Sequence, residues 1–157
     1  MTASLVPFIE KNRIDRSLTG SNMQKQAVPL LSPEAPTVGT GIEGDIAQNS
    51  SQLIVAEGAG EVVRADGDEV HVKYSGGVKI YEPIHFAKSN DDRSINQKVR
   101  VTRGQKVKKG DVLIEGASVA DGELALGRDL VVAFMPWGGY NMDDAIVLSS
   151  KLVQDDT

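Results

Sequence analysis

Hydrophobic and polar positions alternate along residues 60–83, whose sequence is GEVVRADGDEVHVKYSGGVKIYEP. A period of two predicts short strands, and the two interruptions, ADGD and SGG, are typical of hairpin turns. We therefore expect three antiparallel strands in this region. The DGD triplet of residues 66–68 resembles a metal-binding motif, but its position between two alternating segments favours a turn in which Asp-Gly adopts a positive φ.

Short strands alternate with glycines again in residues 98–116, KVRVTRGQKVKKGDVLIEG. Turns are expected at Gly104, Gly110 and Gly116, because glycine accepts backbone conformations that other residues avoid. The polar sequence HFAKSNDDRSINQ at residues 85–97 predicts a loop between the two strand-rich regions. Such an arrangement is typical of a small β-barrel.

A helix is predicted within residues 1–30. Ile14 and Leu18 are four positions apart and Asn12 is suited to cap the start of the helix, while Pro29 marks its end. The N-terminal part of the chain is therefore expected to differ from the β-rich remainder.

Four residues at spacings of four, three and three share one face of this helix: Arg16, Gly20, Met23 and Gln26. An arginine and an amide beside a residue without a side chain form a face that can bind an anion. The alternative is a solvated polar face beside a packed methionine, and the spacing by itself favours this alternative.

Residues 31–44, LSPEAPTVGTGIEG, contain two prolines and three glycines and are predicted to form an extended connection. The glycines of residues 39–44, GTGIEG, match the spacing of a dinucleotide-binding loop. No strand precedes them, and residues 45–52, DIAQNSSQ, have no helical period. The sequence therefore does not support a nucleotide-binding fingerprint at this position.

The composition is that of a folded chain of about one domain, with 157 residues, 40% hydrophobic and 25% charged. A net charge of -5 gives no overall basic field, which argues against autonomous binding to nucleic acid. The absence of cysteine excludes disulfides and thiolate metal sites, and His71 and His85 do not stand in a zinc-binding pattern. Because the sequence has no apolar run of about 20 residues and no signal peptide, we expect a cytosolic protein.

Residues 101–116, VTRGQKVKKGDVLIEG, resemble the hammerhead strands of lipoyl and biotinyl carrier domains. Those domains present a modified lysine within a short motif on a hairpin tip. Lys106, Lys108 and Lys109 stand in no such motif. The fold unit is therefore expected to be shared without the carrier chemistry.

Two adjacent aspartates, Asp143 and Asp144, interrupt the apolar and glycine-rich sequence VVAFMPWGGYNMDDAIVLSS of residues 131–150. Neighbouring carboxylates repel each other unless water or a positive group lies between them. The pair is therefore either a hydrated turn or part of a site for a cation such as Mg²⁺.

The sequence GELALGRDLVVAFMPWGGYNMDDAIVLSS, residues 122–150, resembles the β subunit of bacterial DNA-directed RNA polymerase. Five further segments resemble this family in the same order: SLVPFIE, RSLTGSNMQKQAVPLL, VGTGIE, KSNDDRSINQ and KKGDVLIEG. The resemblance covers essentially the whole chain. Since β subunits are many times longer, it implies an internal segment of such a subunit, either as a fragment or as part of a split one.

The resemblance implies a mainly β fold, a barrel-sandwich hybrid plus part of a double-psi β-barrel, with a short N-terminal helical segment. We expect a helical segment at residues 1–30, an extended connector at 31–57, the barrel-sandwich hybrid at 58–116 and the first part of an incomplete barrel at 117–157. In the family a flap interrupts this barrel, which is completed downstream with two lysines that contact RNA. Neither feature is present in this sequence.

Five candidate site residues also follow from the resemblance. Asp143 and Asp144 correspond to an acidic pair at the active centre, close to the Mg²⁺ that enters with the nucleoside triphosphate. Arg16 corresponds to an arginine that contacts the nucleotide phosphates, for which a guanidinium is suited because it donates two parallel hydrogen bonds. Asn22 and Gln26 correspond to polar residues near the growing RNA end.

The sequence departs from the family pattern at Asp143 and Ser150, where glutamate is common, and at Lys25, where arginine is common. Residues 11–15, KNRID, also differ from the histidine, two acids, alanine and asparagine that are usual in the family. Of the acidic pair, Asp144 is the residue that matches the family aspartate.

The implied partners are the rest of the β subunit, the β′ subunit, the α subunits and a sigma factor, together with DNA template, RNA transcript and nucleoside triphosphates, without a membrane. The aspartate triplet that holds the first Mg²⁺ belongs to the other large subunit. The chain is therefore expected to be inactive alone and to bind Mg²⁺ only weakly. The implied location is the bacterial cytoplasm, at the nucleoid.

The alternative function is a stand-alone barrel-sandwich hybrid that acts as a carrier or protein-binding module. Such a module should cover its apolar residues, whereas a polymerase segment should leave the apolar strands of residues 130–148 partly uncovered. An enzyme in its own right is disfavoured, because the sequence offers neither a nucleophile paired with a base nor a closed metal site.

Overall fold

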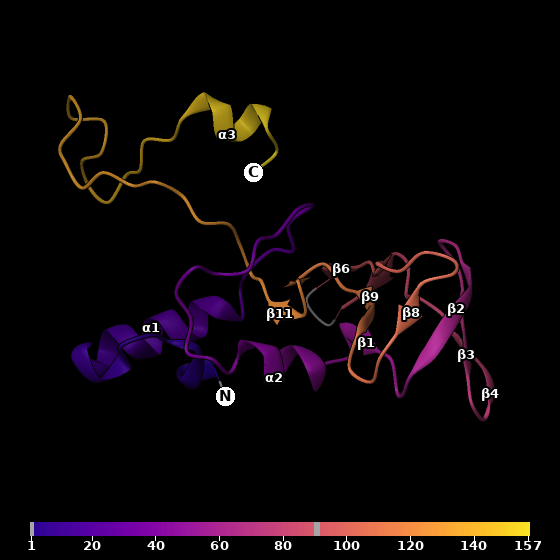
Figure 1. Ribbon diagram of the computed structural model, residues 1–157. Coiled ribbons are helices and arrows are strands. Elements are labelled where there is room, and N and C mark those ends of the chain that lie inside the picture. The colour runs from indigo at the N-terminus through magenta and orange to yellow at the C-terminus, as the bar shows by residue number, and fades with distance from the viewer. Residues whose placement is uncertain (1, 90–91) are drawn as a thin grey trace.

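The computed structural model describes residues 2–89 and 92–157 and confirms a mainly β fold with a short N-terminal helical part. In Figure 1, α1 lies at the left and most strands at the right, with α2 between them. The described helices are the 3-10 helices η1 (Thr2–Leu5) and η2 (Ile9–Lys11) and the α-helices α1 (Ile14–Gln24), α2 (Glu43–Gln48) and α3 (Ser150–Gln154). The described strands are β1 (Leu53–Val55), β2 (Gly60–Ala65), β3 (Val70–Tyr74), β4 (Gly77–Tyr81), β5 (Ala87–Lys88), β6 (Ser94–Ile95), β7 (Lys98–Val99), β8 (Lys106–Val107), β9 (Val112–Glu115), β10 (Val119–Ala120) and β11 (Glu123–Leu124).

The three strands predicted from the alternating pattern form an antiparallel sheet together with β8, in the order β4-β3-β2-β8. Its inner face carries Val62, Val70 and Val72, all 0% exposed. Val62 lies opposite Val72, and the β2–β3 register shifts at a bulge between Val62 and Arg64. The period of two therefore predicted these three strands correctly. Its alternating valines are buried in β2 and β3, whereas Val78 and Ile80 of β4 are exposed.

The β2–β3 turn forms where it was predicted, but through a different interaction. The described residue Gly67 is not among those with a positive φ. Instead, Asp66 Oδ1 accepts hydrogen bonds from the amides of Asp68 at 3.1 Å and Glu69 at 2.8 Å. These bonds, that of Glu69 first, lower the pKa of Asp66. The DGD triplet is a turn, and the expected positive φ was wrong because a side-chain acceptor closes the turn instead.

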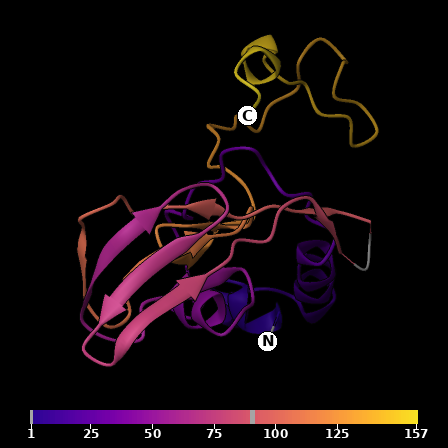
Figure 2. The ribbon, with the colours of Figure 1, turned by 90° about the vertical axis from the view of Figure 1, so that its right-hand side faces the viewer.

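A second antiparallel sheet has the order β1-β9-β7. Leu113 and Ile114 of β9 are 0% exposed and pack in one cluster with Val62, Val72 and Val107 of the first sheet. The two sheets therefore share one aliphatic core, and β2, β3 and β4 form its front layer in Figure 2.

Two of the three predicted turn glycines have the expected conformation, since Gly104 and Gly110 have φ values of 84° and 91°. Gly116 has a different role. Its amide donates to Gln52 O at 2.7 Å, and a Cβ at this position would collide with the Gln52 side chain. Glycine is favoured there because two segments approach closely, not because a turn needs a positive φ.

Helix α1 begins after Arg13, whose side chain makes no capping hydrogen bond, and ends at Gln24. The predicted cap, Asn12, instead donates from Nδ2 to Phe8 O at 3.4 Å. Because the helix ends before the predicted proline boundary, Gln26 lies in the turn that follows it and not on its face.

Three short elements, α2, β5 and β6, lie where the sequence predicted neither helix nor strand. Helix α2 occupies part of the predicted extended connector, and its six residues are too few for a hydrophobic period to emerge. Its anchor is Ala47, which is 0% exposed and packs with Leu53 and Val119. Strands β5 and β6 form a small antiparallel pair, with Ala87 opposite Ile95, within the predicted loop.

After β11 the chain leaves both sheets, and Figures 1 and 2 show the C-terminal segment extending away from them. Between Leu124 and Ser150, a span described in full, the only strand pairing is an isolated bridge from Gly127 to Glu34. The strands expected at residues 130–148 are not formed, because a lone segment has no ladder partner. None of the helices in the described part of the chain has the length and hydropathy needed to cross a bilayer.

Candidate functional site

The acidic pair lies in a tight turn of the exposed C-terminal segment. The amide of Ala145 donates to Met142 O at 3.3 Å and closes a turn around Asp143 and Asp144. Both aspartates are exposed and left-handed, with φ values of 56° and 64°. Two successive positive φ values are the pattern of type I′ turns, which aspartate tolerates better than most residues. Neither carboxylate has a hydrogen bond or ion pair with a described residue, so both face solvent.

The loop before the pair is organised by Asn141. Its Oδ1 accepts a hydrogen bond from the Trp137 amide at 3.0 Å, and its Nδ2 donates to Met135 O at 2.7 Å. Gly138 and Gly139 reverse the chain with φ values of 55° and 78°. The acidic turn is therefore presented on a loop that is held by its own hydrogen bonds.

The three polar candidates of the N-terminal part are all exposed: Arg16 and Asn22 on α1, and Gln26 in the turn after it. Arg16 has no ion pair with a described residue. An ion pair near the start of this helix joins Arg13 to Asp15 at 3.3 Å. The Arg16 guanidinium is therefore available to an external anion.

The structure does not bring these three residues next to the acidic pair. In Figures 1 and 2 alike, α1 lies well apart from the C-terminal loop that precedes α3. The five candidates therefore form two separate groups within this chain.

The connector after α1 contacts the start of the C-terminal segment. We call this contact, formed by residues 34–37 and 127–129, the junction. The amide of Glu34 donates to Gly127 O at 3.0 Å. Arg128 Nη2 donates to Glu34 Oε1 at 2.6 Å. A backbone bond and an ion pair thus act on the same residue and set where the C-terminal segment leaves the sheets.

Thr37 and Asp129 form the other half of the junction. The Thr37 amide donates to Asp129 Oδ2 at 3.0 Å, and the Thr37 hydroxyl donates to the same oxygen. These two donors, the hydroxyl first, lower the pKa of Asp129. The Asp129 carboxylate is therefore held as an anion by a partner within the chain.

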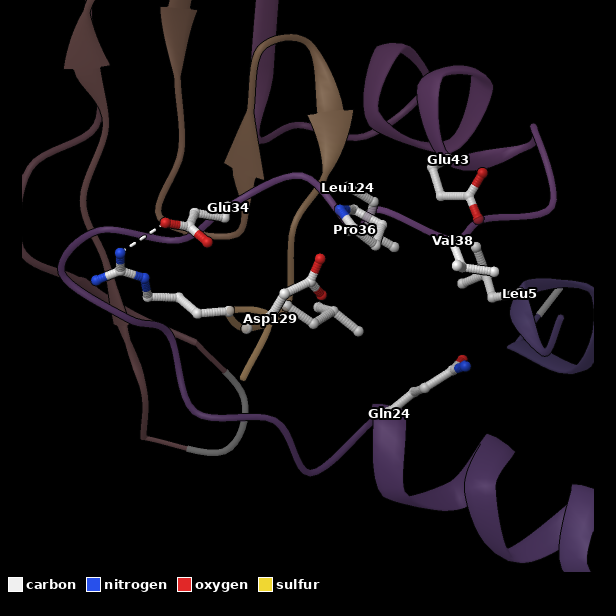
Figure 3. Close-up of a pocket in the computed structure, with 11 residues that line it drawn as sticks. Leu5, Gln24, Glu34, Pro36, Val38, Glu43, Leu124 and Asp129 are labelled. Atoms are coloured by element: carbon white, nitrogen blue, oxygen red, sulfur yellow. Dashed lines mark hydrogen bonds and ion pairs between the residues drawn. The ribbon is translucent and has the colours of Figure 1, made fainter. Parts of the chain in front are cut away.

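A cavity of about 210 Å³ lies beside the junction, between α1, α2 and the residues that follow β11. Figure 3 shows Gln24, Val38 and Glu43 around this space. Gln24 Oε1 is buried without a hydrogen-bond partner among the described residues. The carboxylates around the cavity already have hydrogen-bond donors or an ion-pair partner within the chain.

Glu43 explains why the GTGIEG loop is not a phosphate site. This side chain is 7% exposed, and it accepts hydrogen bonds from the amides of Thr40 at 2.7 Å and Gly41 at 2.8 Å. A Cβ at Gly39 would lie 2.8 Å from Glu43 Oε1. The amides of Thr40, then of Glu43 itself, hold the pKa of Glu43 below its ordinary value. The chain's own carboxylate thus occupies the donors that a bound phosphate would need.

The two histidines have structural hydrogen bonds. His71 Nε2 lies 2.8 Å from Glu69 Oε2. His85 Nε2 donates to Gly67 O at 2.7 Å, while its Nδ1 lies 3.2 Å from Asn96 Oδ1. The hydrogen bond to the Gly67 carbonyl raises the pKa of His85, and the bond with Asn96 adds a smaller effect in the same direction. Among the described residues no group of three or more His, Cys, Asp and Glu side chains is placed to hold a metal ion.

Comparison with known proteins identifies the family. The family model RNA polymerase Rpb2, domain 6, matches residues 2–157. The chain belongs to this family. It is 50% identical over its whole length to the DNA-directed RNA polymerase subunit beta of Nitratidesulfovibrio vulgaris, and 52% identical over 99% of its length to that of Flavobacterium psychrophilum. The match takes up 12% and 13% of these subunits, so the chain spans about one eighth of the length of these relatives.

The Rpb2 domain 6 family confirms the resemblance to the bacterial β subunit, and it leaves the roles of the five candidate residues as predictions. The sequence reasoning missed Glu43 and the junction. Glu43 lies within the glycine-rich loop GTGIEG, and a glutamate at such a position could have suggested that the loop is closed by its own carboxylate. The junction had no such signal, because its partners are about 90 residues apart in sequence.

The acidic pair has the oxygen ligands that Mg²⁺ prefers, but too few of them for a complete site. Carboxylate oxygens are the donors that Mg²⁺ prefers, and both carboxylates are accessible. Octahedral coordination needs about six oxygens, and the described residues add no third carboxylate to the pair. The two carboxylates alone therefore cannot complete the coordination of a Mg²⁺ ion, and a site there would need further ligands.

Proposed function

We propose that the chain acts as a segment of the β subunit of DNA-directed RNA polymerase and contributes nucleotide, Mg²⁺ and RNA contacts to the active centre. The observation that carries this proposal is the match of the whole chain, at about 50% identity, to proteins named as that subunit. The partners would be the rest of the β subunit, the β′ and α subunits and sigma factor, with DNA, RNA and nucleoside triphosphates. The site of action would be the nucleoid in the cytoplasm.

The acidic turn suits this function physically. Phosphoryl transfer depends mainly on positioning and on neutralising charge on the phosphates. Asp144, with Asp143 beside it, would contribute one or two oxygens, directly or through water, to the Mg²⁺ that accompanies the triphosphate. The remaining ligands would be the triphosphate itself and carboxylates of the β′ subunit.

The uncovered C-terminal segment favours a polymerase segment over a stand-alone module. Phe134 is 99% exposed and Ile146 is 81% exposed, and other large apolar side chains of residues 130–148 are similarly uncovered. A soluble module would normally bury an apolar run of this length. In the proposed complex, strands of the remaining β subunit would pair with this segment and cover it.

A chimeric β subunit tests the proposed function. The matching segment of the Nitratidesulfovibrio vulgaris β subunit is replaced by this chain, and the enzyme is assembled with its own β′ and α subunits. We expect template-directed RNA synthesis by the chimera and none by the isolated chain, because the chain lacks the other Mg²⁺ ligands. RNA synthesis is measured as incorporation of labelled nucleotides on a primed template.

The control is the same subunit with this segment deleted, which should be inactive. A chimera that assembles with β′ yet makes no RNA would argue that this chain lost the polymerase role. RNA synthesis by the isolated chain would argue for an enzyme in its own right.

Replacing Arg16 by lysine in the chimera should weaken nucleotide use more than RNA binding. Lysine keeps the charge but loses the paired donors that match a phosphate. We expect kcat/KM for the nucleotide to fall by about 10-fold, with RNA affinity nearly unchanged. The matched control is Arg13→Lys, since Arg13 lies one turn earlier and is paired with Asp15. Equal losses in nucleotide use and RNA affinity would contradict the assignment of Arg16.

A further inference from the structure

Phe86 is held in an unusual backbone conformation and points into solvent. Its φ is 49°, which is rare for a bulky aromatic residue, and it is 82% exposed. Left-handed backbone at such a residue is strained, so it persists only where its surroundings enforce it. Exposure also means that burial of the ring does not compensate for this strain.

The residues before Phe86 enforce this conformation. Gln97 is 1% exposed. Its backbone amide donates to Ile84 O at 2.9 Å, and its Oε1 accepts from the Ile84 backbone amide at 2.8 Å. Gln97 Nε2 also donates to Ser51 O at 2.9 Å. His85 is fixed on both ring nitrogens, as described above. Because the two preceding residues are anchored, the chain presents the Phe86 ring outward as a fixed feature.

Phe86 lines a second cavity of about 320 Å³, between residues 29–33, β7 and the end of β9. Lys98 and Arg100 also line it. This volume is at the lower end of the range of about 300–1,000 Å³ typical of small-ligand sites. An exposed aromatic ring and two cations therefore face one concave space.

The two cations retain donors for a ligand. Lys98 Nζ donates to Leu31 O at 3.2 Å, which uses one of its three hydrogens. Arg100 Nε donates at 2.5 Å to Glu115, a side chain that is only 4% exposed. The two terminal nitrogens of Arg100 have no partner among the described residues. With two cations and one carboxylate in its lining, the cavity carries one net positive charge.

We propose that this cavity binds a nucleotide unit, with the base stacked on Phe86 and a phosphate held by Lys98 and Arg100. A guanidinium edge with two free nitrogens matches phosphate oxygens, and an aromatic face accepts any base. An acidic peptide would use the cations but would leave the exposed face of the ring unused. The site is separate from the acidic turn and from Arg16, and it does not depend on the proposed polymerase role.

Fluorescence anisotropy of the full chain with a labelled 12-residue oligothymidylate tests this proposal. Phe86→Ala should weaken binding by at least about fivefold, the effect of a lost base stack. Lys98→Gln should weaken it by about threefold and lower the slope of affinity against salt by about one. Arg100 is left intact because its removal would leave Glu115 buried without its partner. Should Phe86→Ala fold poorly, Phe86→Asn keeps a residue that tolerates a positive φ.

Two matched controls separate this site from general effects. Phe8→Ala removes another exposed left-handed phenylalanine, and Lys106→Gln removes another exposed lysine, and neither residue lines the cavity. Both should bind like the parent. Competition by AMP would assign the site to free nucleotides, and failure of AMP to compete would assign it to single strands.

The proposal is overturned if Phe86→Ala and Lys98→Gln bind like the two controls, or if the parent chain binds neither AMP nor the oligonucleotide. It is also overturned if a glutamate-rich peptide displaces the oligonucleotide from the parent and binds Phe86→Ala equally well. That result would show that the cations bind carboxylates without help from the ring.

Discussion

Replacing Asp144 by asparagine in the assembled polymerase is expected to slow nucleotide addition by about 10- to 1,000-fold, the range of a lost electrostatic contact at a reacting phosphate. The change removes one negative charge near the proposed Mg²⁺-triphosphate and keeps the size of the side chain. It should also keep the turn, because asparagine tolerates the left-handed backbone that Asp144 adopts at a φ of 64°. The loss should be partly restored by higher Mg²⁺, since the variant would bind the ion more weakly.

The measurement is single-nucleotide addition at several Mg²⁺ concentrations. Asp143→Asn should slow addition less, although the effects of two neighbouring carboxylates are expected to be coupled. The matched control is Asp121→Asn, because Asp121 is also exposed and left-handed, with a φ of 55°, but lies outside the acidic turn. If Asp144→Asn equals the parent at limiting Mg²⁺, the pair is a solvated turn.

Replacing Glu43 by glutamine is expected to lower the free energy of unfolding by about 1–3 kcal/mol at neutral pH, the contribution of hydrogen bonds to a charged group. Glutamine retains one acceptor oxygen, whereas Glu43 uses two, one for Thr40 and one for Gly41. The loop closed by Glu43 packs beside the junction, so the loss should also loosen the contact between α2 and β11. Urea unfolding followed by far-ultraviolet circular dichroism measures the change.

The difference between the parent and Glu43→Gln should depend on pH. The folded state lowers the pKa of Glu43 below the ordinary value of 4.5, so the unfolded chain takes up a proton first as the pH falls. The stability from this carboxylate is present above that value and is lost as the pH falls through the folded pKa. Glu61→Gln, at an exposed position of β2, should change stability by less than about 0.5 kcal/mol. A difference for Glu43→Gln that is as large at pH 3 as at pH 7 would contradict this account.

Local sequence determined the strands β2, β3 and β4 and the turns at Gly104 and Gly110. These features depend only on residues close in sequence, because both the alternation of a strand and the glycine of a turn can be identified from a few consecutive residues. The acidic pair, the most distinctive feature of the C-terminal segment, was also recognisable from the sequence. So was the family, because the matching motifs cover the whole chain.

Only the tertiary structure decided the features that depend on distant partners. The ladder of β1 with β9, the junction of Thr37 with Asp129 and the anchoring of Ile84 by Gln97 each join segments whose proximity no local pattern encodes. Helix α2 is equally dependent on context, since six residues with one fully buried alanine gain their stability from packing and not from propensity.

The strands predicted at residues 130–148 also depended on distant partners. Their apolar composition was read correctly from the sequence, and their side chains are exposed. A strand, however, is defined by hydrogen bonds to a neighbouring strand, and none of the described residues provides such a neighbour there. The sequence by itself determined which residues have the propensity to form strands, and the tertiary contacts decided which of them do, because a ladder requires two segments.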